Sequence, residues 1–206
     1  MLIKNTKSLC PVCNAVLSAD IVEEDGQVWI VRTCEEHGRF RNLYWSDADM
    51  YHRFEEYESI GNGLENPQKT ADESECPFAC GICNNHKSGT LLANIDLTNR
   101  CNLNCDFCFA NARACGFVYE PSFDEITGMM RMLRDELPVP CPAVQLSGGE
   151  PTMRDDLVEI VRTAKKMGFS QVQVATNGIK LAQDITLVQD LKDAGLSTVY
   201  LHFDGV

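Results

Sequence analysis

The chain has 206 residues, 44% of them apolar, and a formal net charge of −12. This length and composition are typical of a globular protein with one medium-sized domain and room for a smaller one. The negative charge argues against electrostatic binding to nucleic acid and against a polybasic membrane anchor. No stretch has the roughly 18 to 20 apolar residues of a membrane span, and no signal peptide is evident. We therefore expect a cytoplasmic protein with no nucleic-acid partner and no integral membrane segment.

Eleven cysteines are many for such a chain, and all but Cys115 and Cys141 fall in short clusters. A disulfide framework is typical of small secreted proteins and usually uses an even number of cysteines. We therefore expect a reducing environment in which the clustered thiolates bind metal. The two isolated cysteines are expected to be small, buried core residues.

Residues 1–60 are expected to form a small metal-binding β module followed by a helix. Residues 28–31 and 40–45 have the composition of short strands. Residues 46–60 carry helical spacing, and Ser46 with Asp49 resembles the capping box that begins a helix.

Four potential metal ligands lie in this module: Cys10 and Cys13, then, after a hairpin-like excursion, Cys34 and His37. Three thiolates and one imidazole at these spacings are typical of a tetrahedral site of zinc-ribbon or rubredoxin type. Ligand softness favours zinc, because iron–thiolate ligation would prefer a fourth cysteine. The alternative is that His37 is a structural histidine and another cysteine completes the site.

Residues 61–89 are expected to be a linker that carries a cysteine triad. The linker begins with a polar, acidic stretch rich in turn formers, which reaches residue 75. The triad is Cys76, Cys80 and Cys83, with the spacing C-x3-C-x2-C. This spacing suits an iron–sulfur cluster, and zinc is the alternative. Either would need a further ligand, for which the candidates are Cys115, Cys141, His86 or a residue absent from the chain.

Residues 90–206 alternate between apolar strands and helices. Strands are predicted at residues 91–97, 143–146, 172–175 and 199–203, and helices at residues 122–137, 154–167 and 181–194. The nearly constant spacing of the later strands indicates an α/β fold with a parallel sheet. Periodicity does not separate a barrel from an open, doubly wound sheet. Because no helix follows the fourth strand, we expect the fold to be truncated here.

Two motifs follow successive strands of this region. Cys101, Cys105 and Cys108 repeat the spacing C-x3-C-x2-C directly after the first strand, where a zinc loop or redox thiols are the alternatives. The turn Gly148-Gly149-Glu150 follows the next strand, and its glycines allow the backbone to come close to a ligand. The alternative there is a plain turn with a helix-capping Thr152.

Together these two motifs resemble those of the radical S-adenosylmethionine (SAM) enzymes, over residues 90–206. The resemblance implies a partial (β/α)6 TIM-like barrel with a [4Fe-4S] cluster at its mouth. It also implies that an electron from the cluster cleaves SAM to a 5′-deoxyadenosyl radical, which abstracts a substrate hydrogen. The electron would come from a reducing donor of ferredoxin or flavodoxin type.

The resemblance also implies roles for single residues. Cys101, Cys105 and Cys108 would ligate the cluster, and Phe107 would lie against the adenine of SAM. Gly148, Gly149 and Glu150 would hold its methionyl end. Asn177 and Asp204, at later strand ends, are candidate contacts to SAM or substrate, and ordinary turn chemistry is their alternative.

The first triad lacks this context, because no strand precedes it and Ile82 stands where the motif has an aromatic residue. We therefore expect Cys76, Cys80 and Cys83 to hold an auxiliary cluster. The order of the three cysteine groups resembles the group of tetraether lipid synthases, near which a pterin-methylating relative is placed. This resemblance favours iron at Cys10, Cys13, Cys34 and His37, so both metals stay open.

The resulting hypothesis is a radical SAM enzyme that couples lipid alkyl chains through a carbon–carbon bond, peripheral to the membrane if its substrate is a lipid. One alternative is a radical SAM methylase or maturase acting on a pterin, another small molecule or a peptide. The other is a non-catalytic iron–sulfur or zinc protein.

Overall fold

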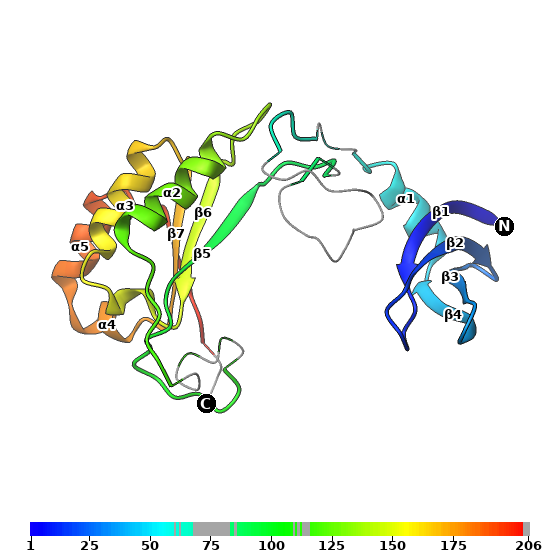
Figure 1. Ribbon diagram of the computed structural model, residues 1–206, viewed down its shortest axis with the longest axis horizontal. Coiled ribbons are helices and arrows are strands. Elements are labelled where there is room, and N and C mark those ends of the chain that lie inside the picture. Colours follow the sequence, from blue (N-terminus) through cyan, green and yellow to red (C-terminus); the bar gives the residue numbers. More distant parts are fainter. Residues whose placement is uncertain are drawn as a thin grey trace. The chain divides into compact units, whose positions relative to one another are not determined.

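The computed structural model describes residues 1–59, 61, 63–67, 83–84, 86–108, 110, 112 and 116–203. The chain divides into two compact units, Met1–Ser59 and Ile60–Val206. Each unit is described by itself, with the labels of Figure 1.

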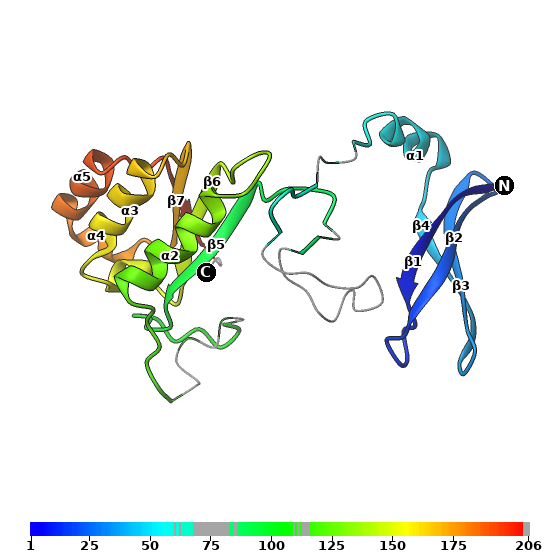
Figure 2. The ribbon, with the colours of Figure 1, turned by 45° about the horizontal axis from the view of Figure 1, so that its top comes forward.

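The first unit is a four-stranded antiparallel sheet in which each strand pairs with the next along the chain (Figure 2). The central hairpin turns at Asp25 and Gly26, which both have positive φ angles, of 53° and 72°. Such angles are typical of the tight hairpin turns that Asp-Gly pairs favour. The strands are β1 (Leu2–Leu9), β2 (Val16–Glu24), β3 (Gln27–Cys34) and β4 (Gly38–Trp45), so both predicted strands are confirmed within longer ones.

Helix α1 (Ala48–Glu55) packs on this sheet through a small core of Ile21, Val28, Ala48 and Tyr51. The predicted Ser46 cap was wrong, because the Asp47 side chain accepts the hydrogen bond from the Met50 amide, at 3.0 Å. Serine and aspartate are equally good caps, so their order in the sequence does not decide between them. The helix is also shorter than predicted.

The second unit contains a parallel sheet whose strands lie in the order β5-β6-β7-β8. Figure 1 shows its helices on one side of the sheet. A doubly wound sheet has helices on both faces and reverses its strand order, whereas a barrel does neither. The arrangement is therefore that of a partial barrel. Its strands are β5 (Leu92–Thr98), β6 (Ala143–Gly148), β7 (Gln171–Thr176) and β8 (Thr198–Leu201).

The helices of this unit confirm most of the predicted pattern and correct two boundaries. They are α2 (Phe123–Arg134), α3 (Leu157–Lys166), α4 (Ile179–Gln183) and α5 (Ile185–Asp193). The predicted capping box at Ser122 and Glu125 is confirmed. The helix predicted from Arg154 begins only at Leu157, after a short 3-10 turn, η2 (Pro151–Met153).

The single helix predicted over residues 181–194 is two helices, α4 and α5, which meet at Asp184. The carboxylate of Asp184 accepts a hydrogen bond from the Leu187 amide, so this residue ends α4 and caps α5. None of the helices in the described ranges is long and apolar enough to cross a membrane.

The core of the second unit lies between the sheet and its helices. Val144 and Leu146 of β6, and Val172 and Val174 of β7, are fully buried there. This packing fixes the strands of the sheet, and the two motifs lie at the carboxyl ends of β5 and β6. Figure 1 shows the loop that follows β5 extending beyond those strand ends.

Candidate functional site

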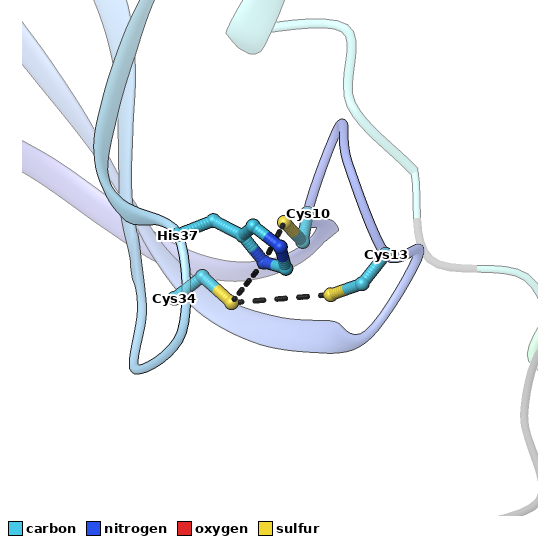
Figure 3. Close-up of side chains that lie close together, drawn as sticks. All are labelled: Cys10, Cys13, Cys34 and His37. Carbon is cyan, nitrogen blue, oxygen red and sulfur yellow. Dashed lines mark hydrogen bonds between the residues drawn. The ribbon is translucent and has the colours of Figure 1, made fainter.

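The first unit brings together the four ligands predicted for a metal ion (Figure 3). Cys10 and Cys13 lie in the β1–β2 connection, Cys34 is the last residue of β3, and His37 lies in the β3–β4 connection. Their ligand atoms all lie within 4.8 Å of one another. The structure therefore brings the predicted three thiols and one imidazole together.

The spacing of these atoms fits tetrahedral coordination. The Sγ atoms of Cys13 and Cys34 are 3.9 Å apart, and the His37 Nδ1 atom is 3.5 Å from the Cys34 Sγ and 3.8 Å from the Cys10 Sγ. A tetrahedral ion at zinc bond lengths requires about 3.8 Å between two sulfurs and about 3.6 Å between sulfur and nitrogen. These three distances are therefore close to those around a single tetrahedral ion.

The backbone around the site prepares a thiolate for the metal. The Val12 amide points at the Cys10 Sγ, at 3.5 Å, and the Cys10 amide donates to the Ala15 carbonyl, at 2.9 Å. Burial is the largest single influence and opposes ionisation of Cys10. Hydrogen bonds from the amides of Cys13 and Val12, together with contacts to the thiols of Cys13 and Cys34, nevertheless lower the pKa of the Cys10 thiol to about 7. Metal binding needs the thiolate, so this environment suits a ligand.

The second cysteine group lies in the loop after β5, at the carboxyl ends of the strands. Cys101, Cys105 and Cys108 are free thiols, of which Cys105 is exposed and the others are half-buried. The Leu103 amide points at the Cys101 Sγ, at 3.4 Å. In a four-iron cluster each cysteine binds a different iron, and ligation of such a cluster by these three thiols stays a prediction. Phe107 is 68% exposed, which leaves its ring open to a ligand.

The two glycines of the Gly148-Gly149-Glu150 turn allow this turn to approach the backbone of residues 98–100 closely. Gly148 has a φ angle of 127°, and a Cβ atom there would lie 2.2 Å from the Thr98 carbonyl oxygen. A Cβ atom on Gly149 would lie 2.4 Å from the Arg100 carbonyl oxygen. The Gly149 and Glu150 amides donate to these same two carbonyls, at 2.7 and 2.8 Å. The turn therefore holds the backbone that leads directly into Cys101.

Glu150 is 1% exposed, and its carboxylate is bound by the chain itself. It accepts hydrogen bonds from the amide and hydroxyl of Thr152, the hydroxyl of Thr176 and the amide of Asn177, at 2.6 to 3.0 Å. Thr152 thus donates to Glu150 and caps no helix. Contact between Glu150 and SAM stays a prediction, and it would have to share a carboxylate that already has four donors.

Asn177 joins the cysteine loop to the end of β7. Its Nδ2 atom donates to the Asn102 side chain at 2.7 Å, and its Oδ1 atom accepts from the Ile179 amide at 3.1 Å. Asn102 lies between Cys101 and Cys105, and no sequence motif marks it as functional. Only the fold brings it to a residue 75 positions away.

Several predicted ligands lie outside the described residues: Cys76, Cys80, Cys115 and Asp204. Cys83 is buried, and its Sγ atom lies 3.4 Å from the His86 Nδ1 atom. Cys141 is buried in the core, as expected, and its thiol donates to the Ala143 carbonyl. Burial raises the pKa of the Cys141 thiol. The auxiliary cluster stays a prediction.

Comparisons with known families match each unit separately. Residues 2–46 match the family described as the HMPTM N-terminal zinc ribbon domain. Residues 95–206 match the radical SAM superfamily. The first match agrees with the zinc favoured by ligand softness.

Similar curated proteins have related names. The 7,8-dihydro-6-hydroxymethylpterin dimethyltransferase of Methanocaldococcus jannaschii is 56% identical over 98% of this chain and 39% of its own length. A probable GTP 3′,8-cyclase of Methanothermobacter marburgensis is 35% identical over 60% of this chain and 38% of its own length. The Fe-coproporphyrin III synthase of Methanosarcina barkeri is 37% identical over 54% of this chain and 26% of its own length. The chain thus spans about two fifths, or less, of these relatives.

These findings favour the pterin alternative over the coupling of lipid alkyl chains, which they do not support. The expectations of lipid biosynthesis and of a peripheral membrane location have no support either. The partial barrel, the paired motifs and the family match agree with one another. The chain belongs to the radical SAM superfamily of enzymes, and within it the pterin-methylase-like group is supported.

Proposed function

We propose that this chain carries the SAM-cleaving part of a methyltransferase that acts on a reduced pterin. The observation that carries the proposal is the 56% identity to a pterin dimethyltransferase over 98% of the chain. This similarity includes the metal module and the linker as well as the partial barrel, whereas the GTP 3′,8-cyclase matches only 60% of the chain.

The residues at the strand ends have separate tasks in this proposal. Cys101, Cys105 and Cys108 would hold a [4Fe-4S] cluster and leave one iron for SAM. When bound and reduced, the cluster supplies the electron that cleaves SAM. The exposed ring of Phe107 offers a surface for the adenine. The turn at Gly148 and Gly149, tied to Thr98 and Arg100, keeps the methionyl end and the cysteine loop in register.

The metal module has a different role in the proposal. Its site has four protein ligands within 4.8 Å of one another and therefore no open position for a substrate. Closed sites of this kind are structural. We propose zinc as the bound ion, and a structural rather than catalytic function for it.

The proposal is tested by supplying the pterin directly. The protein is reconstituted anaerobically with iron and sulfide, then mixed with SAM, dithionite and 7,8-dihydro-6-hydroxymethylpterin. We expect mass spectrometry to detect a pterin that has gained one or two methyl groups. SAM labelled in its methyl group shows whether that methyl is the one transferred.

Two controls make the outcome specific. The Cys105→Ala variant is expected to abolish methylation, because it removes a cluster ligand. GTP in place of the pterin tests the activity named for the second relative. A protein that cleaves SAM but leaves the pterin unchanged, with or without added methyl donors, would overturn the substrate proposal and leave the family assignment intact.

A further inference from the structure

The loop that carries Cys101, Cys105 and Cys108 is closed at its base by its own backbone. The Asn99 amide donates to the Tyr119 carbonyl at 3.1 Å, and the Tyr119 amide donates to the Asn99 side chain at 2.8 Å. The Asn99 side chain also donates to the Phe117 carbonyl at 2.8 Å. Residues 97–100 and 117–121, the two ends of the loop, form its neck.

Arg154 binds both sides of the neck at once. Its NH1 atom donates to the Leu97 carbonyl at 2.9 Å and to the Pro121 carbonyl at 2.7 Å. Leu97 lies just before the loop leaves the sheet, and Pro121 lies just before helix α2 begins. A single guanidinium therefore joins the two ends of the loop.

The arginine is itself held in place. Arg154 is 9% exposed, and its Nε and NH2 atoms donate to the two carboxylate oxygens of Asp156, at 2.8 and 2.7 Å. Paired bonds of this kind fix the plane of a guanidinium. The hydrogen bonds from Arg154 in turn lower the pKa of Asp156. The remaining NH1 donors are thus aimed at the two neck carbonyls.

Hydrogen bonds to Glu120 also connect the two sides of the neck. The Oε1 atom of Glu120 accepts from the Thr98 hydroxyl at 2.6 Å and from the Arg100 Nε at 2.5 Å. Thr98 and Arg100 are also the residues whose carbonyls bind the Gly148-Gly149-Glu150 turn. The segment directly before Cys101 is thus held from three directions.

We propose that Arg154 is a positioning residue for the iron–sulfur cluster. Arg154 closes the neck and so determines where the three thiols of the loop can lie. A buried carbonyl that loses its donor is left unsatisfied, so removing the guanidinium should open the neck. When the ends of a loop move apart, the loop samples more conformations. Its three thiols then adopt the arrangement that binds a cluster less often. This inference rests on the proposed cluster site at Cys101, Cys105 and Cys108.

The chain offers a matched control in Arg134. Its guanidinium also donates to two carbonyls, those of Cys141 and Met167, at 2.6 and 3.2 Å, and lies over the ring of Phe169. Cys141 precedes β6, so these contacts are at the opposite end of the sheet from the cysteine loop. Arg134→Gln should lower stability as Arg154→Gln does, without opening the neck.

The first measurement needs no cluster. Hydrogen–deuterium exchange is followed on the full chain, with a metal ion bound in the metal module but without addition of iron and sulfide. The amides of Asn99, Gly149 and Glu150 should exchange at least about tenfold faster in Arg154→Gln than in the wild type and in Arg134→Gln. Arg154→Lys keeps the charge but not the paired bonds to Asp156, so it should fall between the two.

The second measurement follows anaerobic reconstitution of the same variants. We expect Arg154→Gln to bind less iron and sulfide per chain, and to raise the KM for SAM more than it lowers kcat. Equal neck exchange and equal iron content in Arg154→Gln and Arg134→Gln would overturn the proposal. If the wild type itself takes up no cluster, the proposed function fails, while the exchange data still decide whether Arg154 closes the neck.

Discussion

In the metal module, short spacings in the sequence bring the metal ligands together. Cys10 and Cys13 are three positions apart, as are Cys34 and His37, and each pair lies where one strand turns into the next. The antiparallel sheet brings the two connections to the same end, where four ligand atoms meet. A small core of four buried residues accompanies this site, so the ion should supply much of the stability of the unit.

Removal of the metal should therefore unfold the first unit. In Cys34→Ala we expect loss of the bound ion and loss of cooperative unfolding of this unit, because zinc-binding energies in small modules reach about 10 kcal/mol or more. Elemental analysis and circular dichroism with and without a chelator measure this. Cys141→Ala is the control and should keep its metal. A folded first unit in metal-free Cys34→Ala would contradict the structural role.

Substitution of Gly148 should be far more damaging than substitution of another glycine. In Gly148→Ala the added methyl meets the Thr98 carbonyl and the φ angle is strained, so we expect at least about 2 kcal/mol of destabilisation. Gly128 lies within α2 and has open space around it, so Gly128→Ala should be neutral or stabilising by up to about 1 kcal/mol. Urea unfolding compares the two, and equal effects would refute the close approach.

Residue roles were predictable only where the motif is local. The spacing of Cys10, Cys13, Cys34 and His37 is enough to predict their meeting. The hydrogen-bond partners of Glu150 could not be predicted in this way, because Thr176 and Asn177 reach it only through the pairing of β6 and β7. The same holds for Arg154, since nothing in a sequence distinguishes an arginine that binds buried carbonyls from one on the surface.

Elements were predictable where period and caps agree. The strands of the parallel sheet stand out because short, mostly apolar runs alternate with helical patterns at a nearly constant spacing. The break at Asp184 was missed because an aspartate inside a helical pattern is compatible with a helix interior as well as with a cap. A barrel and an open sheet differ in where the helices lie and in the order of the strands, and periodicity records neither.

The corrected start of α1 gives a test at the element scale. Asp47→Ala should destabilise the first unit by about 1 kcal/mol, because the Met50 amide loses its acceptor. Ser46→Ala should change the unfolding free energy by much less, since this residue does not cap the helix. Chemical unfolding of both variants measures the difference. A larger loss from Ser46→Ala would restore the capping box first predicted.

At the scale of the whole molecule, the superfamily was predictable and the substrate was not. The cysteine loop and the Gly148-Gly149-Glu150 turn are specific because the fold places them at adjacent strand ends. These motifs are shared by the whole superfamily, so they carry no record of the substrate. The comparison over 98% of the chain replaced the lipid hypothesis with a pterin.

We propose above all that Cys101, Cys105 and Cys108 hold a cluster that cleaves SAM. The most direct measurement is the formation of 5′-deoxyadenosine after anaerobic reconstitution, with SAM and dithionite added. We expect the product in the wild type and in Cys141→Ala, and none in Cys105→Ala or without dithionite. A fully loaded cluster that yields no 5′-deoxyadenosine, or a Cys105→Ala variant that yields as much as the wild type, would contradict the claim.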